Sequence, residues 1–435
     1  MAIKDKAEIS NGMEKIISLC KRRGFIFPGS EIYGGLANSW DFGPLGVELK
    51  NNIKKLWWKK FVHQRDDIVG LDSSIIAQSK IWEASGHLKE FSDPLIECKK
   101  CHQRFRQGEI ENSCPSCSNK EFTEDKQFNL MFKTNLGPVE GDTAYLRPET
   151  AQGMFVDFKN ILNSNRLKIP FGIAQIGKAF RNEITPGNFI FRTREFEMME
   201  IEYFIKEKDW ESSFEDWRKE MHDWMKMIGI DAKKIHEIEV PEKERAHYSK
   251  RTIDFEYEFP FGQKELYGLA YRGDFDLKNH EKASGKSLKY RDADTGEEFL
   301  PHVIEPTWGV ERSVLAILDS SYQEEKDRMV LKLNYQLAPY KAAVFPLLAN
   351  KPQLVDLAKS IYSDLRKEIM VDWDSRGNVG KRYYAQDEIG TPFCITVDFD
   401  SLESKDVTIR DRDTTKQERV KIQDLFNVMK QKLEK

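Results

Sequence analysis

A stretch of alternating side chains between residues 171 and 204 constrains the fold of this chain more than any other segment. The alternation predicts two β-strands, residues 171–183 and 194–204, joined by a short connection. The connection carries a turn signal at residues 185–188, Thr-Pro-Gly-Asn. We therefore expect a long hairpin at the centre of the fold.

The hairpin brings together side chains that suit a nucleotide. Alternate residues of a strand share a face, so Arg181 and Glu183 face one way, and Arg194, Phe196 and Glu200 share a face of the second strand. Arginine suits bidentate contact with phosphate, and an aromatic ring offers a base a stacking surface. The alternative is a surface hairpin with cross-strand ion pairs. The hairpin alone leaves both interpretations open.

Length and composition narrow the class of protein. A chain of 435 residues is too long for one ordinary core, so we expect two or three domains. Hydrophobic residues make up 40% and charged residues 32%, as in a soluble globular protein, and no apolar run approaches the roughly 20 residues of a membrane span. Residues 1–23 do not resemble a secretory signal. We expect a cytoplasmic protein with no membrane partner. The net charge of −4 gives no support to general nucleic-acid coating, although a local basic groove is compatible with it.

Four of the six cysteines form a pattern typical of zinc. Cys98, Cys101, Cys114 and Cys117 make a CxxC–x12–CxxC pair, in which four thiolates suit tetrahedral Zn²⁺. All four protein positions would be filled, so the pattern favours a structural zinc ribbon, inserted at residues 94–126, over a catalytic zinc. A redox pair or a metal-free remnant is the alternative. The remaining cysteines are isolated, which argues against a disulfide framework and for a reducing compartment.

Other segments are assigned by periodicity. Residues 47–63 predict a helix with an apolar stripe, which is either part of the core or a subunit interface. Residues 67–76 predict a short strand, and the polar residues 278–298 a loop. From residue 337 strands and helices alternate, which indicates an α/β domain of about 100 residues. We expect domains at residues 1–336 and 337–435.

Three landmarks resemble the signature motifs of class II aminoacyl-tRNA synthetases. Phe180-Arg181-Asn182-Glu183 with Arg194-Glu195-Phe196 resembles motif 2, Gly309-Val310-Glu311-Arg312 resembles motif 3, and the helix after Gly43-Pro44 resembles motif 1. Residues 147–153 (RPETAQG), 191–196 (FRTREF) and Glu305-Pro306 followed by Gly309 are similar to the glycyl-tRNA synthetase family of the homodimeric type. Residues 387–393 (DEIGTPF) resemble the anticodon-binding domain of that family.

The resemblance implies an α+β protein. Its catalytic domain would carry a mixed, mainly antiparallel sheet with helices, followed by an α/β anticodon-binding domain. The implied activity is glycine–tRNA ligation: glycine and ATP give glycyl-adenylate and pyrophosphate, and glycine then passes to the 3′ end of tRNA(Gly). ATP with Mg²⁺, a structural Zn²⁺ and a homodimer follow from the same resemblance. Two alternatives are a catalytically silent relative that only binds nucleic acid and a class II enzyme of another specificity.

The resemblance also assigns residues. It gives Arg181 and Arg312 catalytic roles. It places ATP on Arg181, Asn182, Glu183, Phe191, Arg192, Thr193, Arg194, Glu195, Phe196, Glu265, Leu266, Gly309, Val310, Glu311 and Arg312. It places glycine on Arg106, Glu149, Phe196, Glu197, Met198, Met199, Glu200, Glu305, Pro306, Thr307, Trp308 and Gly309.

The chain departs from the family pattern at two places. Thr307-Trp308 stand where the family more usually has Ser and a smaller or different residue, and the proline that commonly closes motif 1 is absent around Ser73-Ser74. In the anticodon-binding domain, Arg382 and Arg410 are candidate tRNA contacts, with an ordinary surface role as the alternative.

Overall fold

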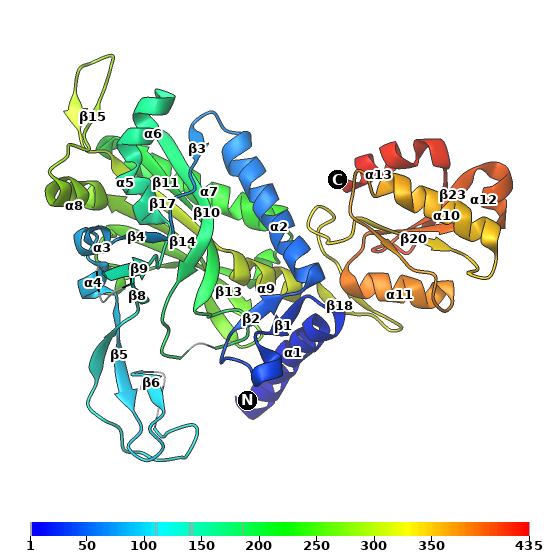
Figure 1. Cartoon of the computed structure of the whole chain (residues 1–435), viewed down its shortest axis with the longest axis horizontal. Helices are drawn as coiled ribbons and strands as arrows, with labels where there is room; N and C mark the ends of the chain where they lie inside the picture. Colours follow the sequence, from blue (N-terminus) through cyan, green and yellow to red (C-terminus); the bar gives the residue numbers. More distant parts are fainter. Residues whose placement is uncertain are drawn as a thin grey trace.

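The structure is a computed structural model of the whole chain (Figure 1). It describes residues 2–108, 110, 112–138, 141, 143–185 and 187–434, with side chains from residue 12 onward. Pro186 of the predicted turn, and Glu109 and Glu111 of the predicted insertion, lie outside the described residues.

A seven-stranded sheet organises the larger, N-terminal part of the chain. All neighbouring strands are antiparallel except β10 and β3, which pair in parallel, so the sheet is mixed and mainly antiparallel as expected. In spatial order its strands are β12 (Ile235–Glu239), β13 (Arg251–Phe259), β14 (Gly262–Gly273), β17 (His302–Gly309), β11 (Glu195–Ile205), β10 (Phe171–Phe180) and β3 (Ile68–Gly70).

The predicted central hairpin is confirmed. Strands β10 and β11 pair antiparallel from Phe171–Phe204 to Phe180–Glu195. The first strand ends at Phe180, three residues before the predicted end, so Arg181 and Glu183 leave the sheet and reach the cavity from its edge.

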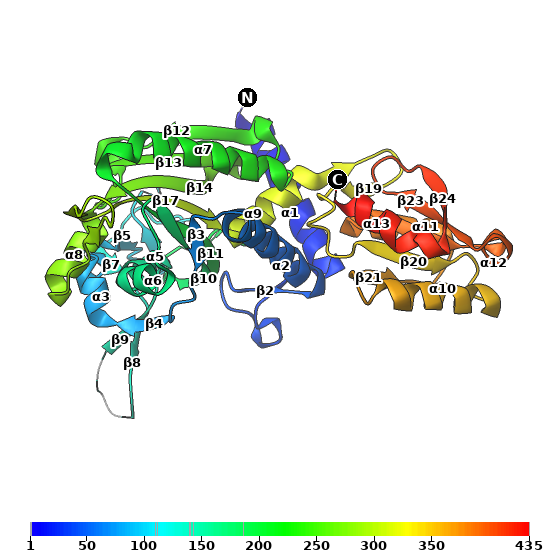
Figure 2. The same cartoon turned by 90° about the horizontal axis from the view of Figure 1, so that it is seen from above.

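Helices cover the two faces of this sheet. One face is covered by α1 (Ala2–Arg23), α2 (Pro44–Trp58) with its π-helical end η2 (Lys59–His63), α7 (Trp210–Met227) and α9 (Val310–Ser321). Figure 2 shows α7 beside the sheet. The helices on the other face are α5 (Ala151–Val156), α6 (Phe158–Asn165) and α8 (Phe275–Ser284). The apolar stripe of residues 47–63 is buried in the first core, so its core interpretation is confirmed.

Alternation along the strands divides the residues between these faces. On β11, Met199, Ile201 and Tyr203 enter the core with α2, α7 and α9. The intervening residues Phe196, Met198 and Glu200 face the other side, where Phe204 joins the core with α5 and α6. One face of the sheet is therefore packed along its length, while the other holds both a core and a cavity.

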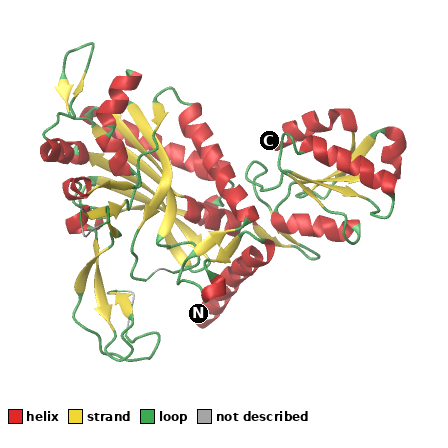
Figure 3. Cartoon of the chain, in the orientation of Figure 1, coloured by secondary structure: helices red, strands yellow, loops and turns green. Residues whose placement is uncertain are grey.

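Smaller sheets extend from this part (Figure 3). A three-stranded sheet carries the cysteine pairs and is built from β5 (Ser92–Glu97), β6 (Arg104–Arg106) and β7 (Lys126–Asn129). The other short elements are β1 (Ile26–Pro28), β2 (Trp40–Phe42), β4 (Ile76–Gln78), α3 (Ser79–Ala84), α4 (His87–Glu90), β8 (Lys133–Asn135), β9 (Thr143–Leu146), β15 (Tyr290–Arg291), β16 (Glu298–Phe299), β18 (Tyr322–Glu324) and β19 (Met329–Leu331).

The C-terminal part forms its own sheet and core, to the right in Figure 1. Its strands, in spatial order, are β21 (Val371–Trp373), β20 (Ala342–Pro346), β22 (Phe393–Val397), β23 (Asp406–Asp411) and β24 (Gln417–Lys421). Its helices are α10 (Pro352–Leu365), α11 (Val379–Ile389), α12 (Phe399–Ser404) and α13 (Leu425–Leu433). The predicted α/β character is confirmed, and β24 is an added edge strand.

Ion pairs join the two parts. Arg328, after β18, donates to Asp387 of α11 at 2.7 Å and to the Arg412 carbonyl at 3.0 Å. Arg22 and Arg23 at the end of α1 pair with Glu388. The Asp387 side chain is fully buried and also accepts from Arg410 at 2.8 and 2.9 Å. The joint thus combines one buried ion pair, Arg328–Asp387, with two pairs whose arginines are partly exposed.

Two sequence expectations are wrong. Residues 67–76 do not form one strand, because β3 and β4 belong to different sheets. Residues 278–298 are not a loop: most of α8 lies there, and β15 pairs with β16. Leu277, Leu288 and Tyr290 pack in the core on the α5 face, and these widely spaced apolar residues stabilise a segment whose average composition is polar.

Candidate active site

A cavity of about 350 Å³ opens on the α5 face of the large sheet. Its floor is formed by the outward residues of β11, β13, β14 and β17, and its rim by the segments that follow β10 and precede β11. Because the opposite face of the same strands is packed with aromatic side chains, the floor is supported along its length.

One end of the cavity is cationic and aromatic. Arg181 donates to the Pro148 carbonyl at 3.0 Å, and its guanidinium lies 5.2 Å from the Phe196 ring centroid. Arg312 bonds the Glu265 carbonyl at 2.9 Å and its carboxylate at 3.0 Å, and lies 4.4 Å from the Phe191 ring. Two fixed guanidinium groups beside aromatic rings suit phosphates and a planar base.

The other end is lined by three carboxylates, those of Glu149, Glu200 and Glu305. Glu149 accepts from Gln152 at 3.0 Å and lies 3.2 Å from the His87 ring nitrogen. Glu200 accepts from the Thr150 backbone N–H at 2.7 Å and from its hydroxyl. Each carboxylate is held by groups of the fold, and together they suit a small cation such as an ammonium group.

The carboxylates differ in their pKa values. Burial raises the pKa of Glu149, but the neighbouring His87 and Arg272 more than offset it, and the pKa lies below its ordinary range. Burial and the charge of Glu149 raise the pKa of Glu200. Burial raises the pKa of Glu305 to about 8, against the opposing effect of Arg272. Like charges that share a buried site push protons onto some members.

A buried guanidinium lies behind these carboxylates. Arg272 is 0% exposed, donates to both oxygens of Asp276 at 2.7 and 2.8 Å, and donates to Glu305 at 2.8 Å. Its guanidinium lies 3.6 Å from the Tyr248 ring centroid. Gln152 extends the network, donating to Asp276 at 3.0 Å, and the His280 ring bonds its amide oxygen at 2.8 Å.

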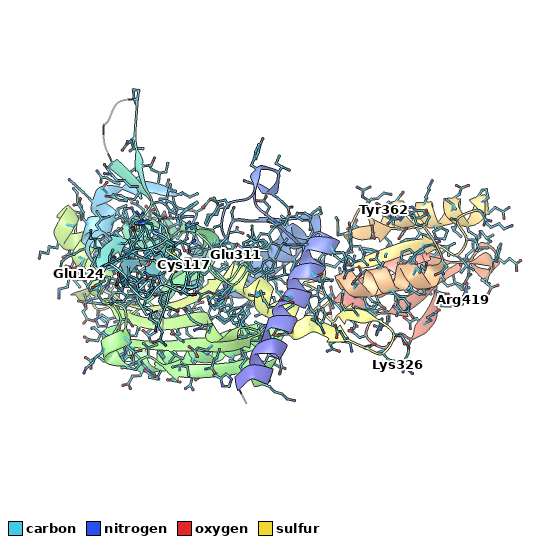
Figure 4. All side chains as sticks on the ribbon, turned by 90° about the horizontal axis from the view of Figure 1, so that it is seen from below. Cys117, Glu124, Glu311, Lys326, Tyr362 and Arg419 are labelled. Atoms are coloured by element: carbon cyan, nitrogen blue, oxygen red, sulfur yellow. The ribbon has the colours of Figure 1, made fainter. Side chains whose placement is uncertain are left out.

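A second network joins the three signature motifs beneath the cationic end. Lys50 of α2 contacts Glu197 of β11 at 2.5 Å and Glu311 of α9 at 2.8 Å. Glu311 also accepts from the Glu197 backbone N–H at 2.8 Å. Figure 4 shows Glu311 in the densely packed centre of the N-terminal part, away from Arg419 and Tyr362 of the C-terminal part. The helix that carries Arg312 is thereby tied to the strand that carries Phe196.

The structure brings most of the sequence-predicted site residues into this cavity. Those that line it are Glu149, Arg181, Glu183, Phe191, Arg192, Thr193, Phe196, Met198, Glu200, Glu265, Leu266, Glu305, Thr307, Gly309, Glu311 and Arg312.

Other predicted residues lie elsewhere. Asn182, Arg194, Glu195 and Glu197 line a separate cavity of about 880 Å³, bordered by residues 36–42. Met199, Trp308 and Val310 are buried in the core on the opposite face of the sheet, and Pro306 is also buried. Arg106 pairs with Asp93 at 2.9 Å on the cysteine-bearing sheet. Consecutive residues of a strand face opposite ways, so a continuous motif cannot contribute all its side chains to one cavity.

Thr307 and Trp308, which depart from the family pattern, lie on opposite faces of the sheet. Thr307 lines the cavity, whereas Trp308 is 0% exposed and packs 5.5 Å from Trp57 and 5.0 Å from Phe61, measured between ring centroids. The large indole therefore supports the floor from behind and takes no volume from the cavity.

Sequence reasoning missed Arg272, Asp276, Tyr248 and His87. Arg272 carried a usable signal: it follows the apolar run of residues 266–271 near the end of β14, and alternation places it with Gly268 and Ala270, which line the cavity. His87 lies in the four-residue helix α4 and Tyr248 in the segment before β13, and both elements are too short for periodicity to reveal their position.

The two arginines suggested as tRNA contacts are structural. Arg382 is 2% exposed and donates to the carbonyls of Pro346, Ser375, Arg376 and Gly377. Arg410 is 5% exposed and pairs with Asp387. Neither side chain is available to an external ligand, so that expectation is wrong.

The four cysteines of the two CxxC pairs converge. Their sulfur atoms all lie within 4.8 Å of one another, with Cys98 and Cys117 at 3.6 Å and Cys101 and Cys114 at 3.5 Å. The two turns match: the His102 N–H bonds the Cys98 carbonyl at 2.9 Å and the Ser118 N–H bonds the Cys114 carbonyl at 2.8 Å. Sulfurs bound to one tetrahedral zinc would lie about 3.8 Å apart, so the donor set fits that ion.

Two family profiles match the chain. The profile described as "tRNA synthetase class II core domain (G, H, P, S and T)" matches residues 132–321, and that described as "Anticodon binding domain" matches residues 341–432. The fold, the three motifs around the cavity and these matches define a class II aminoacyl-tRNA synthetase.

Curated relatives narrow the family. The chain is 51% identical to the glycine–tRNA ligase of Alkaliphilus oremlandii, over 97% of this chain and 98% of the relative. It is 50% identical to that of Clostridium acetobutylicum over the same shares, and 49% identical to that of Bacillus thuringiensis over 97% of this chain and 99% of the relative. The chain belongs to the glycine–tRNA ligase family.

A half-buried carboxyl on the cavity floor predicts a pH effect on stability. Burial, with Glu265 and Glu256 nearby, raises the pKa of Asp254 from its ordinary value to about 7. In the unfolded chain the Asp254 carboxyl ionises at lower pH. The free-energy cost of its charge in the folded protein therefore grows between the two pKa values and is constant above about pH 7. The variant Asp254→Asn should therefore raise Tm more at about pH 8 than at about pH 4.5, measured by scanning calorimetry. The matched control is Asp216→Asn, on the exposed face of α7; an equal gain at both pH values would contradict the assignment.

Proposed function

We propose that this chain ligates glycine to tRNA(Gly) through a glycyl-adenylate, with the cavity on the α5 face as the active site. The observation that carries the proposal is the polarity of the cavity lining, which combines the guanidinium groups of Arg181 and Arg312 beside aromatic rings with the carboxylates of Glu149, Glu200 and Glu305. ATP presents phosphates and a planar base, and glycine presents an ammonium group. A cavity of this polarity orients the two substrates with the glycine carboxylate beside the α-phosphate.

The first step needs positioning and charge stabilisation. A glycine carboxylate oxygen attacks the α-phosphorus of ATP, the bond to the β-phosphate bridging oxygen breaks, and pyrophosphate leaves. In this proposal Arg181 stabilises the charge on the α-phosphate, Phe196 stacks on adenine, and Arg312 covers the other face of adenine and reaches the γ-phosphate. In the second step a hydroxyl of the tRNA terminal ribose attacks the glycyl carbonyl and AMP leaves.

Magnesium belongs to this proposal as the partner of ATP. Glu183 and Glu265 line the cationic end and offer oxygen ligands of the kind that Mg²⁺ takes. The ion would neutralise phosphate charge that the two arginines leave uncompensated.

Glycine selection follows from exclusion by size. Glu149, Glu200 and Glu305 would hold the ammonium group, and side chains such as Met198 and Thr307 line the same space. A site that excludes larger side chains needs no separate editing reaction. The proposed domains, residues 1–336 for catalysis and 337–435 for the anticodon, are supported by the separate core of the C-terminal part.

Amino-acid-dependent ATP–pyrophosphate exchange tests the proposal. Glycine should support exchange, whereas alanine, serine, threonine and proline should not. Arg181→Ala should reduce exchange by at least about 100-fold, because it removes a charged group from the reacting phosphate. Arg366→Ala, an exposed arginine on the C-terminal part, is the matched control.

The alternatives give distinct results in the same assay. Exchange with another amino acid would contradict the glycine assignment and keep the class of enzyme. Folded protein that binds tRNA but exchanges with none of the five amino acids would favour the silent nucleic-acid-binding relative.

We also propose that Cys98, Cys101, Cys114 and Cys117 bind a structural Zn²⁺. The convergence of four sulfurs at zinc-like spacing supports it. The purified protein should contain stoichiometric zinc by mass spectrometry, and Cys114→Ser should remove it and unfold the small sheet. The isolated buried Cys20 supplies the control, since Cys20→Ser should leave the zinc content unchanged. Four free thiols and no zinc in the unaltered protein would contradict the site.

A homodimer is the third proposal, supported by exposed apolar side chains on the segment between β1 and β2. Ile32, Tyr33 and Leu36 are 88, 86 and 64% exposed, which is unusual for a contiguous group. Light scattering after size exclusion should give twice the 50.8 kDa chain mass. The double variant Ile32→Asp with Tyr33→Asp should shift the mass toward the monomer, and Met370→Asp should not. A monomeric unaltered protein would contradict the proposal.

None of the helices in the described part of the chain combines the length and apolar character of a membrane crossing. We propose a cytoplasmic location because tRNA and ATP are both available there, and fractionation of expressing cells would test it.

A further inference from the structure

A buried carboxyl behind the acidic end of the cavity lacks hydrogen-bond partners. Glu202 of β11 is 0% exposed, and neither of its oxygens has a partner among the described residues. It is two residues beyond Glu200 on the same strand, so it shares the face that carries the cavity. Buried polar groups in proteins are almost always hydrogen-bonded, so this exception needs an explanation.

The sheet register gives Glu202 two different neighbours. On β10 it pairs with Ile173, a fully buried apolar residue. On β17 the pairs Glu200–Thr307 and Tyr203–Ile304 flank it, which places it level with Glu305. Side chains directly opposite on neighbouring strands lie about 5 Å apart at Cβ, so the two carboxyl groups are within reach of each other.

The charged groups around this pair are predominantly negative. Those on the packed elements are Glu200 of β11, Glu305 of β17, Asp276 and His280 of α8, Glu149 before α5, His87 of α4, Arg272 of β14 and Tyr248 before β13. Arg272 directs its donors to Asp276 and Glu305 and none to Glu202. An ionised Glu202 would therefore be a second negative charge opposite Glu305, with no cation in contact.

We propose that Glu202 is a positioning residue for the ammonium site: it stays protonated, and its hydroxyl donates to the Glu305 carboxylate. This inference rests on the proposed function, because it gives Glu305 the task of holding the glycine ammonium. The pair carries one proton and one negative charge. Arg272 donates a hydrogen bond to one carboxylate oxygen of Glu305. The Glu202 hydroxyl donates to the other side of the same carboxylate group.

Such a donor has two effects. It fixes the orientation of Glu305, and a hydrogen bond to the ionised form favours that form. Burial raises the pKa of both Glu202 and Glu305, and the pair carries its proton on Glu202 because Arg272 donates to Glu305 and not to Glu202. A neutral carboxylic acid that donates inside an apolar site is an established chemical arrangement.

Two substitutions of similar size separate the donor role from packing. Glu202→Leu fills the space and removes the donor, whereas Glu202→Gln replaces the hydroxyl by an N–H donor. In the exchange assay E202L should raise KM for glycine by about 10–100-fold, the cost of an unsatisfied polar partner, with KM for ATP changed less than about twofold. E202Q should restore KM for glycine to within about threefold of the unaltered protein. Equal loss in E202Q and E202L, or no loss in E202L, would overturn the proposal.

Infrared difference spectra give a second measurement that needs no turnover. The spectrum of the unaltered protein minus that of E202Q, at about pH 7, should show the carbonyl band of one protonated carboxyl, because the bands of other protonated acids such as Asp254 cancel in the difference. The matched control Glu403→Gln, on the exposed surface of α12, should retain the band. A spectrum in which E202Q and the unaltered protein are identical would overturn the protonated state. Absence of any glycine-dependent exchange would instead overturn the proposed function and with it the role toward glycine.

Discussion

The acidic end of the cavity depends on one buried guanidinium. Removing Arg272 from water is costly, and the cost is offset by Asp276, by Glu305 and by the Tyr248 ring. Removing one partner of such a buried pair typically costs about 3–5 kcal/mol. Because Arg272 donates to Asp276 of α8 and to Glu305 of β17, it ties that helix to a strand of the cavity floor. The carboxylates can cluster only because this charge is already inside.

Because side chains alternate along the strands, one face of the large sheet packs into the core and the other face carries the cavity. Trp57, Phe61 and Trp308 pack on one face, while Glu200, Glu305 and Thr307 occupy the other. A large aromatic core on one side lets the other side carry charge and empty volume. The same arrangement explains how a tryptophan directly beside Thr307 leaves the cavity open.

Much of this could be predicted from the sequence, and the failures have physical causes. The hairpin and the C-terminal domain were predictable because alternation and repeated strand–helix order are local signals. Glu197 and Met199 were grouped with Glu200 because a motif is read as a continuous string, whereas a strand directs neighbours to opposite faces. His87 and Arg272 reach the site from segments far apart in sequence, and only tertiary packing brings them together. Arg382 and Arg410 looked like surface cations because a sequence pattern does not show that Arg382 folds back onto the carbonyls of residues 375–377, or that Arg410 meets Asp387.

The joint at Asp387 has a mechanical consequence. Arg328 and Arg410 meet on a single fully buried carboxylate, and Glu388 beside it holds the end of α1. A connection of this kind resists bending, since separating Arg328 from Asp387 would leave a buried carboxylate without one of its cationic partners. These contacts therefore oppose a change in the separation between the cavity and the C-terminal sheet. A ligand that contacts both parts of the chain would have to span that separation.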